Sequence, residues 1–223
     1  MDIHKPKPWR NLRELLKEIG TIVVGVLIAL GAEQAVEWLH WRHEVANERA
    51  ALLDEAEANV SSVNYRIEED PCITRRLAEV EEAFHRQGKG LPLSVGQPVD
   101  RPPLWVATTG SWDIALSGQA LAHMPHKEKL GFSDAFDAYK AFAQLRNEED
   151  GIWRRLGLIH HPDILTTGDW VELHEAFGQA LEMNNRMKSI TAYVMGSASL
   201  GRRPAKPEGT DLSQLQAFCT SAF

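Results

Sequence analysis

Residues 19–34 read IGTIVVGVLIALGAEQ, and the first fourteen of them carry no charged side chain before Glu33. An apolar run of about 10–14 residues is typical of a buried core helix or the core of a signal peptide, because a membrane-spanning helix needs about 20. The flanking residues therefore decide between a membrane anchor, a cleaved signal sequence and a soluble core helix.

The flanks extend this segment to the length of a membrane span. Leu15–Ala32 covers eighteen residues, about 27 Å of helix at about 1.5 Å per residue, and Lys17 can extend its charge toward the lipid headgroups. Trp9 precedes the segment, and Trp38 and Trp41 follow it. Tryptophans on both sides are typical of the two membrane interfaces. We therefore expect a transmembrane helix here.

A cleaved signal peptide is the main alternative. Basic residues precede the apolar run, and Ala29-Leu30-Gly31 resembles a small-x-small cleavage site. However, the helical pattern continues through that site without a proline or a glycine pair. An uncleaved anchor is thus the favoured interpretation. A soluble core helix would need neither the basic lead nor the bracketing tryptophans.

The distribution of charge predicts the orientation. The chain of 223 residues has a net charge of −7, yet residues 1–18 contain five basic and three acidic side chains. Basic residues before a span favour a cytoplasmic N-terminus. We expect a bacterial inner-membrane protein with a cytoplasmic basic N-terminus (1–14), a transmembrane helix (15–32), a periplasmic helical bundle (33–201), and a linker with a short C-terminal helix (202–223). The acidic body argues against nucleic acid as a partner.

The segment LLKEIGTIVVGVLIALGAEQAVEW resembles the opening of an uncharacterised family of bacterial single-pass membrane proteins with an EIxxIVVGVLIAL-type anchor. The matching residues are Glu18, Ile19 and residues 22–30. Where that family continues with an asparagine-tryptophan pair, this chain has Glu33, Gln34 and Trp38. WDIALSGQALAHM (residues 112–124) is similar to a part of the family where a helix ends in Ser-Gly before a short leucine-containing turn. The resemblance implies an anchor and a helical extracytoplasmic domain, and no activity.

The rest of the chain predicts an all-α fold, an N-terminal transmembrane helix continuing into an antiparallel helical bundle. The apolar seam of residues 33–69 is narrow and imperfect, which favours a packed bundle over a long two-stranded coiled coil. Asp70-Pro71 should end this helix. Strand-type alternation and internal repeats are not visible. We expect further helices at 72–87, 126–159, 170–200 and 211–217, with an irregular segment at 88–103.

Two cysteines, Cys72 and Cys219, have no spacing typical of a zinc site. In a reducing compartment they would be free thiols, whereas in the periplasm they form a natural pair. A Cys72–Cys219 disulfide therefore follows from the expected orientation.

The strongest candidate for metal binding is Glu37, His40 and His43, which follow ExxHxxH on one side of a helix. Carboxylate and histidine ligands at this spacing occur in di-iron bundles, but those need a second such set on a facing helix. The favoured interpretation is a polar collar beside the membrane. The HxxH at 123–126 and the HH pair at 160–161 lack a full ligand set. We expect no catalytic residue and no cofactor.

Within the span, the small residues Thr21, Gly25 and Ala29 recur every four positions. Such a face lets another helix approach closely. We therefore expect membrane lipid as one partner, and other integral membrane proteins or a second copy as another. The expected role is a non-enzymatic membrane-anchored accessory or scaffold subunit. The alternative is a periplasmic sensor-like or ligand-binding bundle that acts through a partner.

Overall fold

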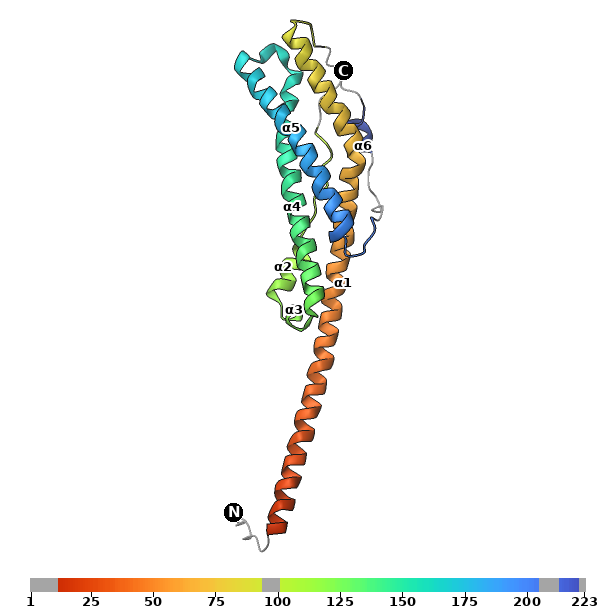
Figure 1. Ribbon diagram of the computed structural model, residues 1–223, viewed down its shortest axis with the longest axis vertical. Helices are drawn as coiled ribbons and strands as arrows, with labels where there is room; N and C mark the ends of the chain where they lie inside the picture. The colour runs from red at the N-terminus through yellow and green to blue at the C-terminus, as the bar shows by residue number, and fades with distance from the viewer. Residues whose placement is uncertain (1–11, 94–100, 205–212, 221–223) are drawn as a thin grey trace. The chain divides into compact units, whose positions relative to one another are not determined.

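The computed structural model describes residues 12–93, 101–204 and 213–220. Every regular element in these ranges is a helix, which confirms the expected all-α class (Figure 1). The chain divides into two compact units, Met1–Asn47 and Glu48–Phe223. Helix α1, Leu12–Gly88, contributes to both. Most of the expected cytoplasmic segment and part of the expected C-terminal linker lie outside the described residues.

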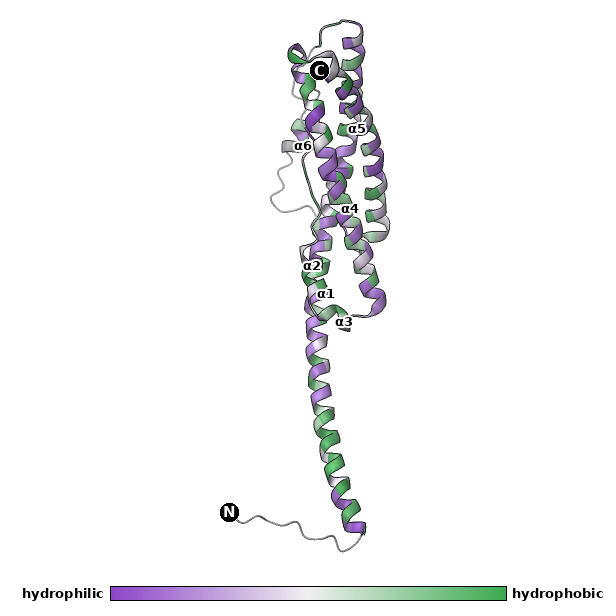
Figure 2. Ribbon diagram, turned by 90° about the vertical axis from the view of Figure 1, so that its left-hand side faces the viewer, coloured by the Kyte–Doolittle hydropathy of each residue, from purple (hydrophilic) through white to green (hydrophobic). Residues whose placement is uncertain are grey.

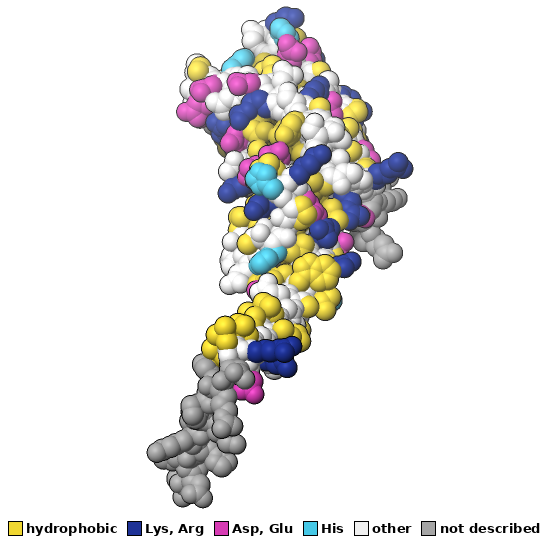
Figure 3. Space-filling view, turned by 60° about the horizontal axis from the view of Figure 1, so that its bottom comes forward, with side chains coloured by type: hydrophobic (Ala, Val, Ile, Leu, Met, Phe, Trp, Pro, Cys, Tyr) yellow, Lys and Arg dark blue, Asp and Glu magenta, His cyan; other side chains and the backbone are white. Residues whose placement is uncertain are grey.

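The first unit is the apolar part of α1. This helix is long and apolar enough to cross a membrane, a property that signal sequences share, and none of its apolar window is buried inside the protein. Ile22, Leu27 and Ile28 are 62%, 62% and 68% exposed. Figure 2 shows the segment as a continuous apolar stretch, and its side chains form the hydrophobic surface near the front of Figure 3.

The expected break at Pro71 is wrong, because α1 continues through this residue to Gly88. A proline inside a helix removes one hydrogen bond and costs about 3 kcal/mol. Pro71 is exposed, so water can solvate the carbonyl group that loses its partner. Buried side chains on both sides of Pro71, Glu69 before it and Ile73 after it, hold the helix against the core. This packing outweighs the tendency of proline to end a helix.

Helices α4 (His126–Leu156) and α5 (Thr167–Tyr193) pack against each other and beside residues 48–88 of α1 (Figures 1 and 2). Arg49 of α1 pairs with Glu128 at the start of α4, at 2.8 Å. Farther along both helices, Arg66 pairs with Glu149, also at 2.8 Å. The two helices therefore run in the same direction.

Helix α5 runs the opposite way to α1. Lys188 Nζ lies 3.4 Å from Asp70 Oδ2, whereas His174, earlier in α5, stacks on Phe84, later in α1, with ring centroids 3.9 Å apart. The antiparallel contacts of the bundle are thus those of α5, with α1 on one side and α4 on the other. The chain between α1 and α4 must travel back along α1.

Residues 89–93 and 101–109 are the described parts of that return, and α1 holds the end of the second part through side chains. The Asn59 amide donates to the Thr108 carbonyl and accepts from the Thr108 N–H, both at 2.8 Å. The Glu55 carboxylate accepts from the N–H groups of Gly110 and Ser111 at 2.9 and 2.8 Å. A carboxylate at the first N–H groups of a helix satisfies donors that lack partners in the helix.

The remaining elements are short: α2 (Gly110–Ser117), α3 (Ala120–His123), the 3₁₀ turns η1 (Gly157–His160) and η2 (Pro162–Ile164), the π-helical turn η3 (Val194–Ala198) and α6 (Ser213–Phe218). Helix α5 begins earlier than expected because Thr166 is its N-cap. Its hydroxyl accepts from the Asp169 N–H while the Asp169 carboxylate accepts from the Thr166 N–H, a complete capping box.

Cys72 of α1 and Cys219, just after α6, form a disulfide that joins positions 147 residues apart in the chain. Arg76 strengthens the same junction, because its guanidinium donates to the carbonyls of Phe218 and Thr220 at 2.9 and 2.6 Å. The Phe218 side chain is 3% exposed and meets the Trp153 ring edge-on. The C-terminal helix is thus attached to the core by one covalent bond and one buried arginine.

Removing the disulfide should lower the free energy of unfolding by about 2–5 kcal/mol, because a long closed loop would regain its freedom in the unfolded chain. Urea unfolding of detergent-solubilised Cys72→Ser, followed by circular dichroism, measures this loss. The double variant Cys72→Ser/Cys219→Ser should lose the same free energy of unfolding as the single variant Cys72→Ser. Identical unfolding of the wild-type chain with and without dithiothreitol would contradict the account.

Candidate functional site: a buried ionic cluster

The centre of the second unit contains four charged side chains that are almost completely buried. Arg66 and Glu69 come from α1, and Arg146 and Glu149 come from α4. Their exposed fractions lie between 0% and 3%. Burying charge is costly unless each group is paired. The arrangement of the pairs is therefore a strong constraint on the fold.

The four residues belong to two copies of one short pattern, RIEED at 66–70 and RNEED at 146–150. In each copy the arginine and the second glutamate are three positions apart, so both lie on the same face of the helix. This recurrence is not among the expectations drawn from the sequence above. Leu145 is half-buried, and Arg146 takes the core position after Phe142.

The two copies pair across the helices rather than within them alone. Arg66 donates to both oxygens of Glu149, from Nη2 at 2.8 Å and from Nε at 3.2 Å. Arg146 Nη2 lies 3.1 Å from Glu69 Oε2, and Arg146 also donates to Glu149 and to the carbonyl of Pro103. Two arginines and two glutamates thus form one connected group.

Helix α5 joins the cluster through Asn184, which is 6% exposed. Its side-chain oxygen accepts from Arg66 Nη2 at 2.7 Å. Arg66 therefore contacts α4 and α5 at once, while Arg146 contacts α4, α1 and the returning segment at Pro103. The cluster fixes the mutual register of all three long helices of this unit and of the chain that connects them.

Glu69 is the least satisfied member of the cluster. It is 0% exposed, and among the described residues neither of its carboxylate oxygens has a hydrogen-bond partner, although Oε2 lies 3.1 Å from Arg146 Nη2. Burial raises the pKa of Glu69 to about 7, against the lowering effect of Arg146 and Arg66 and with a raising contribution from Glu149. The folded protein therefore holds a proton on Glu69 more tightly than the unfolded chain does.

The acidic residues that end each pattern lie at the edge of the cluster. Asp70 is 3.6 Å from Arg66 and 3.4 Å from Lys188. Asp150 accepts from Arg101 at 2.8 Å and pairs with Arg154. The polar network of the cluster thus reaches the surface through Asp70 on α1, whereas Asp150 on α4 makes a separate set of ion pairs.

Chemically, the cluster is suited to structural support. Its carboxylates are closed off from solvent, and none of the three surface grooves described here, of about 400–460 Å³, is lined by Arg66, Glu69 or Arg146. A substrate cannot contact a fully buried carboxylate without opening the bundle. The contacts of the cluster in this structure join the helices of the second unit to one another.

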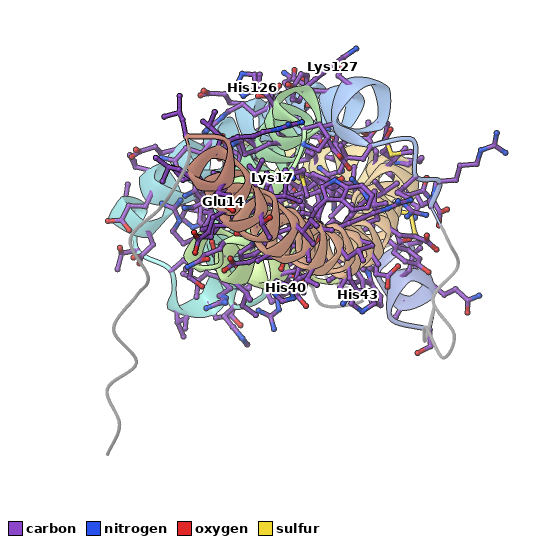
Figure 4. The ribbon with its side chains drawn as sticks, turned by 90° about the horizontal axis from the view of Figure 1, so that it is seen from below. Glu14, Lys17, His40, His43, His126 and Lys127 are labelled. Carbon is purple, nitrogen blue, oxygen red and sulfur yellow. A yellow bond between two sulfur atoms is a disulfide. The ribbon has the colours of Figure 1, made fainter. Side chains whose placement is uncertain are left out.

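The predicted metal candidates lie on the first unit. Figure 4 shows His40 and His43 projecting outward from α1. Glu37 accepts a hydrogen bond from Trp41 Nε1 at 3.5 Å, and the His40 ring lies 5.0 Å from the Trp41 ring. Across the described ranges, no group of three or more histidine, cysteine, aspartate or glutamate side chains is placed to hold a metal ion.

The small-residue face of Thr21, Gly25 and Ala29 is exposed along α1. The Thr21 hydroxyl donates to the Lys17 carbonyl at 2.9 Å, so this polar group is satisfied within its own helix. A Cβ atom at Gly25 would meet nothing within 4 Å. The face is therefore free for an approaching helix in this structure. The predicted cysteine pair, Cys72 and Cys219, is bonded.

Glu69 should make stability depend on pH. Because its pKa rises from 4.5 unfolded to about 7 folded, the free energy of unfolding should fall as pH rises between these values. Glu69→Gln should remove this fall in the free energy of unfolding, which is on the order of 3 kcal/mol. The measurement is urea unfolding of both chains from pH 4 to pH 8. Glu148→Gln, at an exposed position paired with Arg186 at 3.5 Å, is the control. Parallel curves for wild type and Glu69→Gln would refute the assignment.

Arg146→Met should lower the free energy of unfolding by about 3–5 kcal/mol, because it leaves the two buried carboxylates short of a partner. Arg186→Met, which removes only a surface pair with Glu148, should cost less than about 1 kcal/mol. Thermal and urea unfolding of both variants measure the difference. Equal costs would mean that the buried pairs contribute no more than surface ones.

No protein-family model, curated protein or solved structure matches this chain. The resemblance of residues 18–30 to a family of bacterial single-pass membrane proteins therefore stays a prediction.

Proposed function

We propose that this chain is a non-enzymatic accessory or scaffold subunit, anchored in the bacterial inner membrane by α1 and packed against other membrane proteins. The observation that carries the proposal is the exposed apolar part of α1. None of the window long enough to span a bilayer is buried in the protein. Such a surface is stable only in lipid or against another apolar surface.

The proposed orientation places the N-terminus in the cytoplasm and the second unit in the periplasm. Its support is the excess of basic residues before the span. The Cys72–Cys219 disulfide agrees with it, because disulfides persist in the periplasm and are rare in the cytosol. Trp38, 58% exposed just beyond the span, suits a membrane interface.

The non-enzymatic part of the proposal rests on the position of the ionic cluster. Glu69 has a pKa near that of a catalytic acid or base, but its side chain is fully buried. Its described partners are the charged groups that hold α1 and α4 together. A group with this environment supports the fold, and the functional surface is then the exterior of the helices.

A second candidate function is a sensor-like or ligand-binding bundle that signals through a partner. It is favoured by a groove of about 450 Å³ between α4 and α5 with a charged lining. The polar lining residues are Asn147, Glu148, Arg155, Gln179, Glu182 and Arg186. Arg155 donates to Gln179 across this groove, so a ligand would have to compete with an existing contact. This makes the scaffold role the better supported of the two.

Gly25→Leu should weaken assembly in the membrane, because a leucine side chain would hold a neighbouring helix away from the small-residue face. A loss of about 1 kcal/mol, or about fivefold in association, is expected for such contacts. The measurement is mass spectrometry of intact assemblies after gentle detergent extraction. It compares the bound fraction of the variant with that of the wild-type chain.

Gly20→Leu is the matched control, since a Cβ atom at Gly20 also meets nothing within 4 Å and residue 20 lies on another side of the helix. This variant should assemble like the wild type. A wild-type chain recovered only as a single free copy would sink the subunit proposal. Assembly unchanged in Gly25→Leu would exclude this face from the contact.

A further inference from the structure

Helix α6 is short and lies beside the later part of α1 (Figure 1). It has six residues, Ser213–Phe218, whereas isolated helices shorter than about 12–15 residues are marginal in water. Among the described side chains of residues 213–220, Phe218 is the buried one, at 3% exposure. The position of α6 therefore depends on the contacts that Phe218 and the following Cys219 make with the rest of the second unit.

Phe218 lies against Trp153 of α4 and Arg76 of α1, a pair that we call the Phe218 seat. The two seat residues are 2% and 3% exposed. The Trp153 and Phe218 rings meet edge-on with centroids 6.1 Å apart, and the Arg76 guanidinium lies 5.6 Å from the Phe218 centroid. Arg76 Nη2 also donates to the carbonyls of Phe218 and Thr220. The seat thus holds one aromatic ring and two backbone carbonyls.

Docking of residues 213–220 in this seat depends on the disulfide. Ordering each residue of a free chain costs conformational entropy, and here the segment is ordered for one buried ring and two hydrogen bonds to its carbonyls. The entropy cost of the whole segment exceeds that return. The Cys72–Cys219 bond lowers the cost, because it holds Phe218 beside the seat at a high effective concentration. Without the bond, the segment should leave the seat.

The position of the disulfide suits reduction in the folded protein. Cys72 and Cys219 are both half-buried, although Phe218 beside them is covered. Disulfides that are exposed to solvent are typically the labile ones. Arg76 lies one helical turn after Cys72 on the same face, and its bonds to the carbonyls on both sides of Cys219 place it beside the bridge. A cation there favours the thiolate that leaves when the bond breaks.

We propose that the Cys72–Cys219 disulfide is a redox-sensitive latch, which a dithiol reductant opens to release residues 213–220 while α1, α4 and α5 stay packed. A thiolate of the reductant bonds to Cys219 Sγ, and Cys72 Sγ leaves as a thiolate beside Arg76. The second thiol of the reductant then displaces Cys219 Sγ. Two electrons and two protons pass to the protein, so both cysteines end as thiols and the reductant ends as a disulfide.

Opening the latch changes the surface of the second unit without dissolving its core. The ionic cluster joins α1, α4 and α5 without a contribution from α6. Arg76 also pairs with Glu79 of its own helix at 2.8 Å, so it keeps its place after the segment has left. Release uncovers Trp153 and removes two carbonyl acceptors from Arg76. The oxidised and reduced chains therefore present different surfaces to a partner, a regulation that goes beyond the proposed accessory role and is independent of the membrane anchor.

Thiol labelling of the folded chain tests whether the latch opens. The full chain in detergent is treated with dithiothreitol without denaturant, and its free thiols are counted by the mass that a maleimide adds. The expected result is that both cysteines of the chain are labelled while circular dichroism keeps its helical signal. Labelling that requires urea would show that the bond is closed off in the folded chain, and would overturn the latch.

Hydrogen exchange of the same samples tests the release. In the oxidised chain the Cys219 N–H donates to the Leu215 carbonyl at 2.8 Å, and the Thr220 N–H donates to the Ala217 carbonyl at 3.1 Å. Reduction should speed the exchange of these amides at least about tenfold and leave the amides of α4 and α5 unchanged. Cys72→Ser/Cys219→Ser is the control, which should exchange like the reduced chain and should not respond to dithiothreitol.

Two exchange results would overturn the latch. Unchanged protection of residues 219 and 220 after reduction would mean that the Phe218 seat holds the segment without the bond. Faster exchange throughout α4 and α5 would mean that the bond braces the whole bundle and releases no separate segment. Neither result would bear on the accessory-subunit proposal, which depends on the first unit.

Discussion

Cross-pairing of two arginines and two glutamates in the core is the interaction on which the second unit depends. Arg66 must reach Glu149, and Arg146 must reach Glu69, because an unpaired charge at these depths would cost several kcal/mol. These pairs require α1 and α4 to lie side by side in the same direction. Two neighbouring helices that run in parallel need a long return between them, and residues 101–109 are a described part of it. Helix α5 then runs back against both and contributes Asn184 to the same cluster.

The first unit obeys a different constraint, because none of its apolar window is buried by the described residues. One helix therefore serves two environments. Its earlier residues need lipid or another apolar helix, and its later residues supply half of a buried ionic cluster. The Cys72–Cys219 disulfide joins the later part of this helix to the C-terminal helix. In the proposed topology, the bond forms only after α1 has delivered the second unit to the periplasm.

The sequence predicted the helical class and, in the described residues 91–93 and 101–103, the irregular backbone after Gly88, because composition, proline and glycine signals act locally. It also predicted the pairing of Cys72 with Cys219 that the structure contains, through the expected compartment. The break at Pro71 was a wrong prediction, since local preference there is weaker than the packing of Glu69 and Ile73 on either side. The ionic cluster was missed because charged residues are normally assigned to the surface. The recurrence of RxEED at 66–70 and 146–150, in phase with buried apolar neighbours, was the signal that could have revealed it.

The direct test of the account is the intact mass of the chain recovered from membranes washed with alkaline carbonate. Such a wash removes peripheral proteins and leaves those that span the bilayer. The account predicts that the chain stays in the pellet with residues 19–34 still attached, because Leu15–Ala32 is an uncleaved span. A soluble chain, or one whose mass shows cleavage after Gly31, would contradict the anchor and all that is built on it.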